Sequence, residues 1–454
     1  MTDDGLQASI EKMRAEGVPQ VAIDTFAHYY EQLREGASGM LPESEIERVE
    51  DLPTLDDLPE GDPGLVDSAI VLKLNGGLGT SMGMTQAKSL IEAKDGKTFL
   101  DIIVGQVLGL RERFGARVPL VLMNSFATRD DSLAALRARP EIESDVPLDF
   151  VQNKVPKIGA DDLQPVSWPA DPRLEWAPPG HGDLYTALVT SGMLETLLER
   201  GYRYAFVSNS DNLGAVLEPH ILSWLAREEV PFAMEVARRT EADRKGGHLA
   251  RRRDDGLVLR ETAQTPEEDL EKLQDVDRHP YVNTNNLWVD LEALRDTLDA
   301  RDGVLGLPII VNRKTVDPGD SDSPAVVQLE TAMGAAIGVF DGAQALHVPR
   351  RRFAPVKTTN DLLALRSDAY VLLEDSRVEL APEREQPPFI DLDSEFYKLI
   401  RDFEARFPAG PPSLVACERL VVTGDVTFGR DVVVRGAVTV EGPARIEDSS
   451  VLTG

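Results

Sequence analysis

A short apolar run that leads into several glycines and then a lysine is the part of the sequence best suited to binding an anion. Within residues 71–90 the run ends at Leu74, and the basic residue is Lys88. The glycines between them are Gly76, Gly77, Gly79 and Gly83. Glycines let backbone N–H groups approach an anion closely, and a helix starting after them would add its positive end. The spacing fits neither the P-loop nor the dinucleotide fingerprint, so it predicts a phosphate-binding turn of another lineage.

Composition limits the classes of partner. With 454 residues the chain has room for roughly three domains. A formal charge of −30 argues against nucleic acid or an anionic membrane as partner. No apolar stretch approaches the ~18 residues of a membrane span, and no signal peptide is visible. The one cysteine, Cys417, is expected to be a small apolar core residue, and a cytoplasmic location is expected.

The pattern along the chain predicts how the site is positioned. Residues 1–65 are expected to be helical and polar. In residues 66–365, strand candidates (69–74, 120–124, 204–208, 232–236, 287–289 and 309–311) alternate with helical patterns such as Leu184–Leu198 and Gln328–Phe340. This alternation predicts an α/β domain with a largely parallel sheet, whose ligand site lies beyond the strand ends. The proline-rich residues 366–413 are expected to form a connecting region.

Residues 414–454 contain a six-residue repeat. Two rows of aliphatic positions recur at this period: Val422, Phe428, Val434, Val440, Ile446 and Leu452, and Leu420, Val426, Val432, Val438 and Ala444. Such a period is typical of a parallel β-helix, although an ordinary β-meander is the alternative. The pattern continues to Gly454 without an obvious cap, so we expect another subunit to cover this end and the protein to be a homo-oligomer.

Taken together, the motifs resemble those of the eukaryotic-type UTP–glucose-1-phosphate uridylyltransferases over nearly the whole chain. The segments that carry the resemblance are 74–90, Leu122-Met-Asn-Ser-Phe126, Pro178-Pro-Gly-His-Gly-Asp183, Val207-Ser-Asn-Ser-Asp-Asn-Leu-Gly214, Lys245-Gly-Gly247, Asn283-Thr-Asn-Asn-Leu-Trp288, Gln328-Leu-Glu-Thr-Ala332 and Phe353-Ala-Pro-Val-Lys-Thr-Thr359. The resemblance implies a Rossmann-like, GT-A-like nucleotidyltransferase domain with a mixed, mostly parallel sheet, followed by a left-handed parallel β-helix. It also implies reversible uridylyl transfer from UTP to glucose 1-phosphate, giving UDP-glucose and pyrophosphate with Mg2+.

The resemblance implies roles for particular residues on the nucleotide side. Lys88 and Lys357 would hold the phosphates around the reacting phosphorus, and Asp211 would bind the metal, since Mg2+ commonly uses one or two carboxylates plus substrate phosphates. Gln152 would contact the uracil edge, because an amide can donate and accept at once. The other predicted nucleotide-binding residues are Leu74, Asn75, Gly76, Gly77, Gly79, Gly180 and Asn209. The chain departs from the family at Met84-Thr-Gln-Ala87, where a cysteine and a proline are usual, so the loop before Lys88 is expected to be looser.

Neutral amides and one carboxylate are the expected hexose site. By the resemblance, the sugar-phosphate side comprises His181, Gly246, Gly247, Glu261, Asn283, Asn285 and Asn286. Such groups match the paired hydroxyls of an uncharged sugar ring. For a lone glutamate such as Glu261, an ordinary charge at the end of a strand is the alternative.

Two other functions share these motifs. One is a UDP-sugar or UDP-N-acetylhexosamine pyrophosphorylase. Relatives with that specificity usually carry an arginine where this chain has Ser81-Met82, so glucose is favoured. The other is a non-catalytic regulatory protein of the same fold, which would not need Lys88, Asp211 and Lys357 together, and all three are present.

Overall fold

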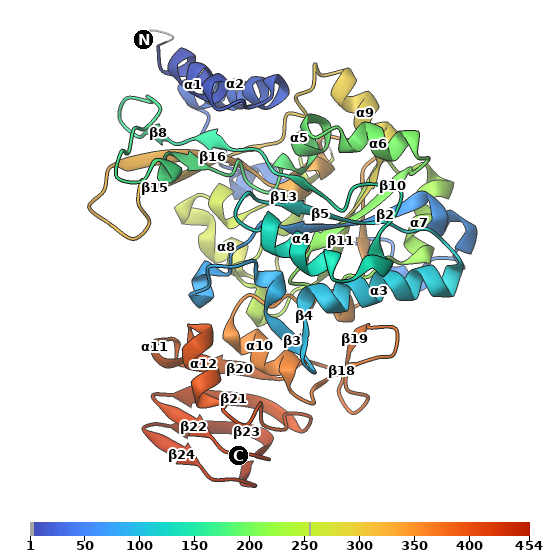
Figure 1. The fold of residues 1–454 in the computed structure, drawn as a ribbon, viewed down its shortest axis with the longest axis vertical. Helices are drawn as coiled ribbons and strands as arrows, with labels where there is room; N and C mark the ends of the chain where they lie inside the picture. Colours follow the sequence, from blue (N-terminus) through green and yellow to red (C-terminus); the bar gives the residue numbers. More distant parts are fainter. Residues whose placement is uncertain (1–3, 254–255) are drawn as a thin grey trace.

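A ten-stranded mixed sheet forms the centre of the protein (Figure 1). The computed structural model describes residues 4–253 and 256–454. The path through the sheet is β1 (Ile46–Glu47), β12 (His248–Arg252), β14 (Tyr281–Asp290), β10 (Tyr204–Asn209), β2 (Ala69–Asn75), β5 (Leu120–Asn124) and β6 (Asp149–Val151), with β11 (Phe232–Arg238), β13 (Leu257–Arg260) and β17 (Gln344–His347) branching from it. The neighbours β10, β2, β5 and β6 are parallel, so their carboxyl ends and the loops that follow meet at one edge.

Helices cover both faces of this sheet. Consecutive residues of β2 point to opposite faces, so Val71 joins one core cluster while Ile70 and Leu72 join another. The first face packs against α3 (Phe99–Phe114) and α7 (Pro219–Glu228), and the second against α5 (Asp183–Thr190), α6 (Met193–Glu199) and α9 (Leu291–Asp299). A short α4 (Arg129–Arg137) follows β5. The parallel strands are thus packed between two hydrophobic cores, which fixes the position of the edge at which these strands end.

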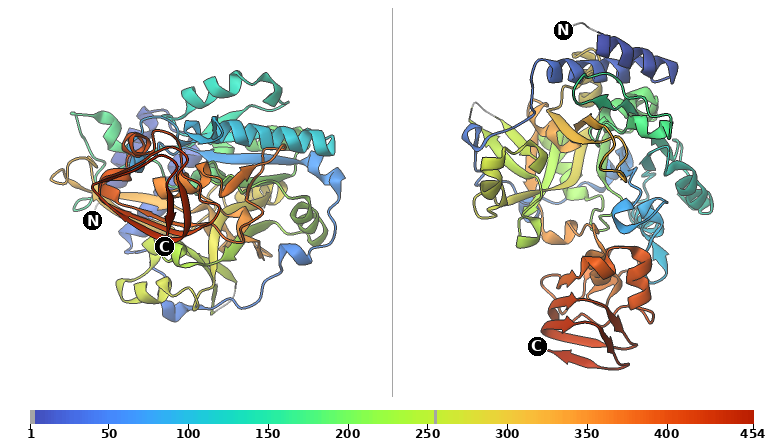
Figure 2. Two further views of the ribbon diagram at one scale, coloured as in Figure 1. Left: turned by 90° about the horizontal axis from the view of Figure 1, so that it is seen from below. Right: turned by 90° about the vertical axis from the view of Figure 1, so that its left-hand side faces the viewer.

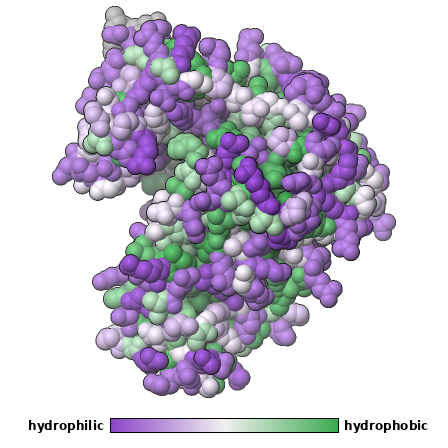
Figure 3. All heavy atoms as spheres, in the orientation of Figure 1, coloured by the Kyte–Doolittle hydropathy of each residue, from purple (hydrophilic) through white to green (hydrophobic). Residues whose placement is uncertain are grey.

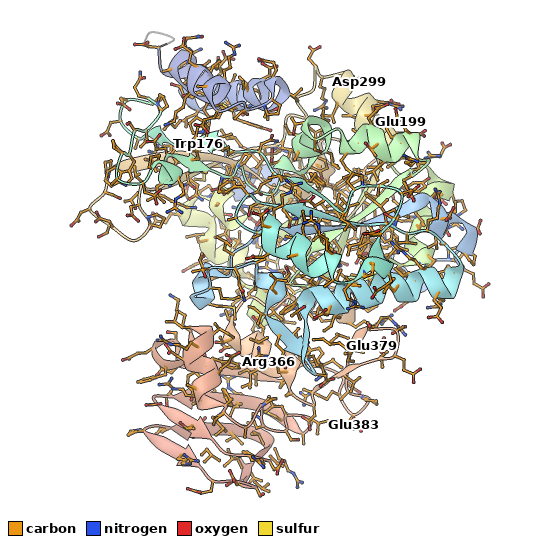
Figure 4. All side chains as sticks on the ribbon, in the orientation of Figure 1. Trp176, Glu199, Asp299, Arg366, Glu379 and Glu383 are labelled. Carbon is orange, nitrogen blue, oxygen red and sulfur yellow. The ribbon has the colours of Figure 1, made fainter. Side chains whose placement is uncertain are left out.

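The N-terminal segment is helical, as its apolar spacing predicts. It forms α1 (Asp4–Ala15) and α2 (Gln20–Arg34), which pack on β7 (Val155–Pro156), β9 (Trp176–Ala177) and the sheet of β15 (Ile309–Thr315), β16 (Ala325–Thr331) and β8 (Ile158–Gly159). In Figure 4, Trp176 lies beneath these two helices. Its ring carries the ammonium groups of Lys12 and Lys154, 5.6 and 4.5 Å from the ring centroid, so the N-terminal helices are held by contacts far away in the sequence.

Three expectations about local structure need correction. The pattern Leu184–Leu198 forms two helices rather than one, because Gly192 between them adopts φ +73°. The predicted helix Gln328–Phe340 is wrong: its first residues belong to β16, paired antiparallel with β15, and a 3-10 turn follows at Met333–Gly338. Pairing with β15 outweighs helical periodicity there, in a strand whose earlier residues include the β-branched Val326 and Val327. After the glycine-rich turn, 3-10 turns at Thr80–Met82 and Lys88–Leu90 stand where a helix was expected.

The last part of the chain is a stack of parallel strands (Figure 2). One row contains β20 (Phe389–Leu392), β21 (Cys417–Thr423), β23 (Val433–Glu441) and β25 (Val451–Thr453), and a second contains β22 (Val426–Phe428) and β24 (Ala444–Ile446). Partners such as Val426 with Ala444 lie eighteen residues apart, which is three hexapeptides. The chain therefore returns to the same place in the stack every eighteen residues, and the six-residue period corresponds to one third of that distance.

The C-terminal stack shares its hydrophobic core with the part of the chain that holds the central sheet. Around the junction lie α10 (Thr359–Arg366), α11 (Ser394–Tyr397), α12 (Ile400–Arg406) and the hairpins β3 (Glu92–Lys94)–β4 (Lys97–Thr98) and β18 (Tyr370–Leu372)–β19 (Val378–Leu380). The Tyr397 hydroxyl donates to the Val426 carbonyl at 2.6 Å, and the Thr359 hydroxyl donates to the Tyr397 carbonyl at 2.8 Å. Figure 4 places Arg366 at this junction, where its guanidinium donates to the Glu92 carbonyl. These hydrogen bonds hold the segment after Lys357 against the C-terminal stack.

Hydrophilic residues cover most of the face in Figure 3, and that face is hollowed between the part holding β15 and β16 and the C-terminal stack below. Among residues 4–253 and 256–454, no helix combines the length and apolar character needed to cross a bilayer.

Candidate functional site

A pocket of about 360 Å³ opens where the parallel strands β2, β5, β6 and β10 end. It brings together every predicted nucleotide-binding residue except Gly79, and also Lys88 and His181. The residues that line it are Leu74, Asn75, Gly76, Gly77, Lys88, Ser89, Met123, Gln152, Pro178, Gly180, His181, Asn209, Ser210 and Asp211.

Buried hydrogen bonds hold the backbone of the glycine turn. The Asn75 carboxamide donates to Asn124 Oδ1 and to Ser132 Oγ, both at 2.8 Å, and Ser125 Oγ donates to the Gly76 carbonyl at 3.0 Å. Because these partners come from the neighbouring strand β5 and helix α4, the turn is positioned by the sheet itself.

The loop that follows closes on itself before it reaches Lys88. The Lys88 N–H donates to the Gly77 carbonyl at 3.1 Å, and the Met84 N–H donates to the Gly79 carbonyl at 3.2 Å. Gly79 has φ +24°, and a Cβ there would come within 2.9 Å of Met84 Sδ. Met84, one of the residues that depart from the family, therefore packs on Gly79. Gly79 lies outside the pocket lining, and its role as a nucleotide ligand stays a prediction.

An ion pair joins two of the predicted catalytic and metal-binding residues. Lys88 Nζ lies 2.8 Å from Asp211 Oδ2 and also donates to the Val356 carbonyl. The Val356 N–H in turn donates to the Asp211 carbonyl at 3.0 Å. Lys88, Asp211 and the residue before Lys357 thus meet at one point, although they are far apart in the sequence.

The second oxygen of Asp211 fits a metal ligand. Oδ1 is buried and makes no hydrogen bond to any residue in 4–253 or 256–454. A buried carboxylate oxygen without a donor calls for an explanation, and a cation is one. The described residues hold no group of three or more His, Cys, Asp or Glu side chains suited to a metal. An ion here would therefore take one carboxylate from the protein and its other ligands from phosphate and water, as Mg2+ commonly does.

Gln152 lies flat over the glycine turn. A Cβ added to Gly76 would be 3.2 Å from Gln152 Oε1, so a side chain at that position would press against the amide. This close approach is why the pocket needs glycine at position 76. It leaves the Gln152 amide in the pocket, where a base could meet it.

His181 is held as a neutral donor. The Met333 N–H donates to His181 Nδ1 at 3.0 Å, so this nitrogen carries no proton and the ring proton is on Nε2. Burial lowers the pKa of His181 to about 4, which keeps the ring neutral at ordinary pH. A neutral N–H donor at the pocket wall suits a phosphate or ribose oxygen.

Several of the predicted hexose residues, His181 not among them, form a second cluster near Lys357. A Cβ on Gly247 would lie 2.4 Å from Glu261 Oε2, so the carboxylate packs directly on that glycine. Burial raises the pKa of Glu261, while the Lys357 charge and an Asn283 hydrogen bond lower it. The exposed Lys357 therefore lies close enough to Glu261 for its charge to act on the carboxylate.

A β-bulge sets the direction of the amide side chains on β14. Glu235 and Val236 of β11 pair with Asn286 and Asn283, so Thr284 and Asn285 bulge out between them. Asn285 has φ +57°, and its Oδ1 accepts from Asn283 Nδ2 at 2.9 Å. Bulges of this kind redirect side chains next to active sites.

Asn286 has a different environment from the other amides. It is fully buried, and its carboxamide donates to Glu235 Oε2 at 3.0 Å and to the Arg352 carbonyl at 3.2 Å. Its oxygen accepts from Asn212 at 3.2 Å. Because protein groups occupy the whole carboxamide, direct contact between Asn286 and a sugar stays a prediction. Gly246 lies at the cluster's edge, and its Cβ position meets Val282 at 3.0 Å.

Reasoning from the sequence did not assign several residues that the structure places at the site. Ser89, Met123, Pro178 and Ser210 line the pocket, and Glu235 and Arg352 lie behind it as a fully buried ion pair at 2.6 Å. Met123 and Pro178 stand inside motifs that signal the site. The pairing of Glu235 with Arg352, by contrast, joins segments that are distant in the sequence, so no local motif could predict it.

Alanine variants of two glycines with the same backbone conformation test where the Gly180 loop lies in the pocket wall. Gly180 (φ +79°) would place a Cβ 2.4 Å from the Thr331 carbonyl, whereas Gly192 (φ +73°) has nothing within 4 Å of that position. Both alanine variants bear a left-handed backbone strain of roughly 1–2 kcal/mol. We predict that Gly180→Ala weakens UTP binding at least tenfold in titration calorimetry, on the order expected when a pocket wall shifts, and that Gly192→Ala binds normally. Equal affinities would contradict this placement of the loop.

The chain matches known proteins over nearly its full length. The family model described as UTP–glucose-1-phosphate uridylyltransferase matches residues 23–435. The enzyme of that name from Solanum tuberosum is 43% identical over 84% of this chain and 79% of the relative, and that from Hordeum vulgare is 44% identical over 86% and 81%.

Solved structures agree with the sequence relatives. A mutant UDP-glucose pyrophosphorylase from Leishmania major in complex with UDP-glucose has a TM-score of 0.95 and 46% identity, covering 100% of this chain and 99% of that one. A UDP-glucose phosphorylase from Trypanosoma brucei has a TM-score of 0.91 and 46% identity, covering 99% of this chain and 100% of that one. The chain therefore belongs to the UTP–glucose-1-phosphate uridylyltransferase family.

Proposed function

We propose that the protein catalyses reversible uridylyl transfer from UTP to glucose 1-phosphate, releasing pyrophosphate and forming UDP-glucose. The observation that carries this proposal is the single pocket in which the glycine turn, Gln152, Lys88 and Asp211 converge. Family membership supports the same reaction, and the Leishmania major relative was solved with UDP-glucose bound.

The reaction needs positioning and charge neutralisation more than acid–base groups. A phosphate oxygen of glucose 1-phosphate attacks the α-phosphorus of UTP in line. The bond to pyrophosphate breaks as the new P–O bond forms. Lys88 and Lys357 would hold the phosphate oxygens on which negative charge collects, and the glycine turn would supply backbone N–H donors. Gln152 would contact the uracil, and His181, through its Nε2–H, the sugar phosphate.

Asp211 is our proposed ligand for Mg2+, because its Oδ1 is buried without a partner among the described residues. When bound, the ion would neutralise part of the phosphate charge. Lys88 pairs with the other oxygen of Asp211, so this ion pair would hold both side chains in position beside the phosphates.

Glu261, Gly247, Asn283 and Asn285 are our proposed hexose contacts. Their cluster offers one carboxylate and two amides beside the Lys357 ammonium, which suits an uncharged ring that carries a phosphate. The alternative sugar phosphates would meet the same groups, so the choice of hexose is decided by assay.

The first experiment measures pyrophosphate release from UTP with glucose 1-phosphate, with and without Mg2+. Galactose 1-phosphate and N-acetylglucosamine 1-phosphate serve as matched acceptors. We expect metal-dependent release chiefly with glucose 1-phosphate. Release chiefly with another sugar would overturn the hexose assignment, and no release with any acceptor would favour a non-catalytic regulatory protein.

Replacing Lys357 separates binding from transfer. We predict that Lys357→Ala lowers kcat on the order of 10²–10³-fold, because a charged contact to the transition state is lost, while UTP still binds. Steady-state kinetics and titration calorimetry measure the two effects. Lys97→Ala, at an exposed position in the β3–β4 hairpin, is the control and should keep its kcat. Near-normal turnover in Lys357→Ala would remove this residue from the mechanism.

The C-terminal strands are proposed to form a left-handed parallel β-helix that assembles the protein into a homo-oligomer. The eighteen-residue offset between paired strands supports three hexapeptides per coil. Val451, on the last strand, is 54% exposed, and an uncovered edge strand offers pairing groups to another chain. We also propose domains at 1–65, 66–365, 366–413 and 414–454. A cytoplasmic location is proposed from the single, buried Cys417.

A charge at the last strand tests the assembly. We predict that Val451→Glu lowers the sedimentation coefficient, because a carboxylate at an interface between strands must lose its water. Met40→Glu, at a residue that is 47% exposed and distant in the sequence from the tail, should sediment like the unmodified protein. If Val451→Glu and the unmodified protein sediment alike, this end of the tail is not the contact.

A further inference from the structure

A buried carboxylate lies behind the nucleotide pocket and has no part in the chemistry described so far. Asp183 is the first residue of α5, directly after the loop that carries Gly180 and His181, and it is 5% exposed. Both of its oxygens accept hydrogen bonds from Asn153: Oδ2 from the backbone N–H at 2.6 Å and Oδ1 from Nδ2 at 2.9 Å. Asp183 is not among the residues that line the pocket.

These bonds fix the backbone of the residue that lies over the glycine turn. The Gln152 N–H donates to the Asn124 carbonyl at 2.9 Å, and the next N–H along the chain, that of Asn153, donates to Asp183. The two peptide groups on either side of the Gln152 Cα are therefore both anchored. Because peptide groups are planar, anchoring both of them holds the backbone torsions of Gln152 and the direction of its side chain.

We call the two bonds from Asn153 to Asp183 the clamp. The loop before Asp183 is also held by hydrogen bonds. The Gly182 N–H donates to the Thr331 carbonyl at 2.9 Å, and the Thr331 N–H donates to the Pro179 carbonyl at 3.0 Å. The loop that presents His181 is thus tied to β16, and Asp183 extends this tie to Gln152. One carboxylate connects two walls of the pocket.

We propose that Asp183 is a positioning residue for uracil recognition, holding the Gln152 amide at a fixed place relative to the Gly180–His181 loop. This inference rests on the function proposed above. A carboxamide can pair with uracil or with cytosine, depending on whether its oxygen or its nitrogen faces the base. Discrimination between the two bases therefore requires that the amide be held in place, and Asp183 holds the backbone from which this side chain projects.

The charge state of Asp183 gives the proposal a pH signature. Apolar side chains such as Phe26 and Leu307 surround the same small cavity, and burial raises the pKa of Asp183 to about 7, while the Asn153 bonds lower it. The carboxylate accepts both bonds, whereas the protonated acid gives up one acceptor. The clamp is therefore complete above about pH 7 and weakens as the pH falls through that value.

Two tyrosines and a histidine near Asp183 stay neutral over this range. Burial raises the pKa of Tyr29 on α2 and of Tyr185 on α5, and it lowers that of His181 to about 4. Lys154, next to Asn153, pairs with Glu16 at 2.7 Å. A change in UTP recognition between about pH 6 and about pH 8 that depends on residue 183 therefore reports on Asp183 itself.

The test compares the full-length protein with Asp183→Asn in steady-state assays with UTP and CTP. An asparagine turns an N–H₂ group toward one of the two Asn153 donors and loses that bond. We expect the KM for UTP to rise on the order of tenfold with a smaller change in kcat and none in the KM for glucose 1-phosphate. We also expect kcat/KM for UTP relative to CTP to fall. This ratio should decrease at lower pH in the unmodified protein and be independent of pH in the variant. The titration of UTP itself affects the unmodified protein and the variant equally.

A second aspartate provides the matched control. Asp290 is 7% exposed and accepts from the N–H groups of Glu292 and Ala293 at the start of α9, at the opposite end of the sheet. Asp290→Asn should lower the melting temperature and leave the KM for UTP and the UTP-to-CTP ratio unchanged. An equal loss in both variants would reduce Asp183 to a general stability role, and unchanged kinetics in Asp183→Asn would overturn the proposal.

Two further measurements keep the outcomes distinct. If Asp183→Asn does not fold, Asn153→Ala should raise the KM for UTP in the same direction by a smaller factor, because it keeps the backbone bond to Asp183 and removes the side-chain bond, together with the bond from the Thr190 hydroxyl to Asn153 Oδ1. An Asn153→Ala variant with an unchanged KM and an unmodified protein with a pH-independent UTP-to-CTP ratio would then reject the clamp. If the unmodified protein shows no transfer, the proposed function fails, and calorimetry with UTP and CTP still measures whether Asp183 affects base selection.

Discussion

The buried ion pair between Glu235 and Arg352 connects the three segments on which the site is built. Two hydrogen bonds, at 2.8 and 2.6 Å, join the guanidinium to the carboxylate, and Trp288 Nε1 donates a third bond to it at 2.9 Å. The pair lies between β11, β14 and the segment that continues to Lys357. A buried charge is tolerated only when it is paired and hydrogen-bonded, so these segments cannot move apart without exposing an unpaired ion.

Asn212 extends this constraint to the loop that carries Asp211, the proposed metal ligand. Its carboxamide donates to Asn286 Oδ1 and to the Arg352 carbonyl, and its oxygen accepts from the Ala354 N–H at 3.0 Å. Asp211, the residue before it, is therefore placed by the same network that places the β14 amides. The glycine turn, by contrast, is positioned from the other side through Asn124. The pocket is therefore held in place from both sides.

Prediction from the sequence succeeded where local pattern and sheet geometry coincide. The strands at 120–124 and 204–209 are continuous apolar runs, and parallel strands must bring their carboxyl ends together, so Gly76, Gln152 and Asp211 share a pocket. It failed where long-range pairing decides. The run Gln328–Phe340 is helical by its spacing, but its first residues, up to Thr331, form the end of β16 because β15 pairs with them, and a 3-10 turn follows. The bulge at Asn285 and the contact between Asp183 and Asn153 likewise depend on partners that one sequence cannot reveal.

The pairing of Lys88 with Asp211 has a consequence for how tightly nucleotide is held. The lysine that would hold the phosphates is already oriented by its pair with Asp211. A side chain that is oriented in advance loses less conformational freedom when it binds, so less of the binding free energy goes into ordering it. The same effect would apply to UTP and to UDP-glucose, and therefore to both directions of the reaction.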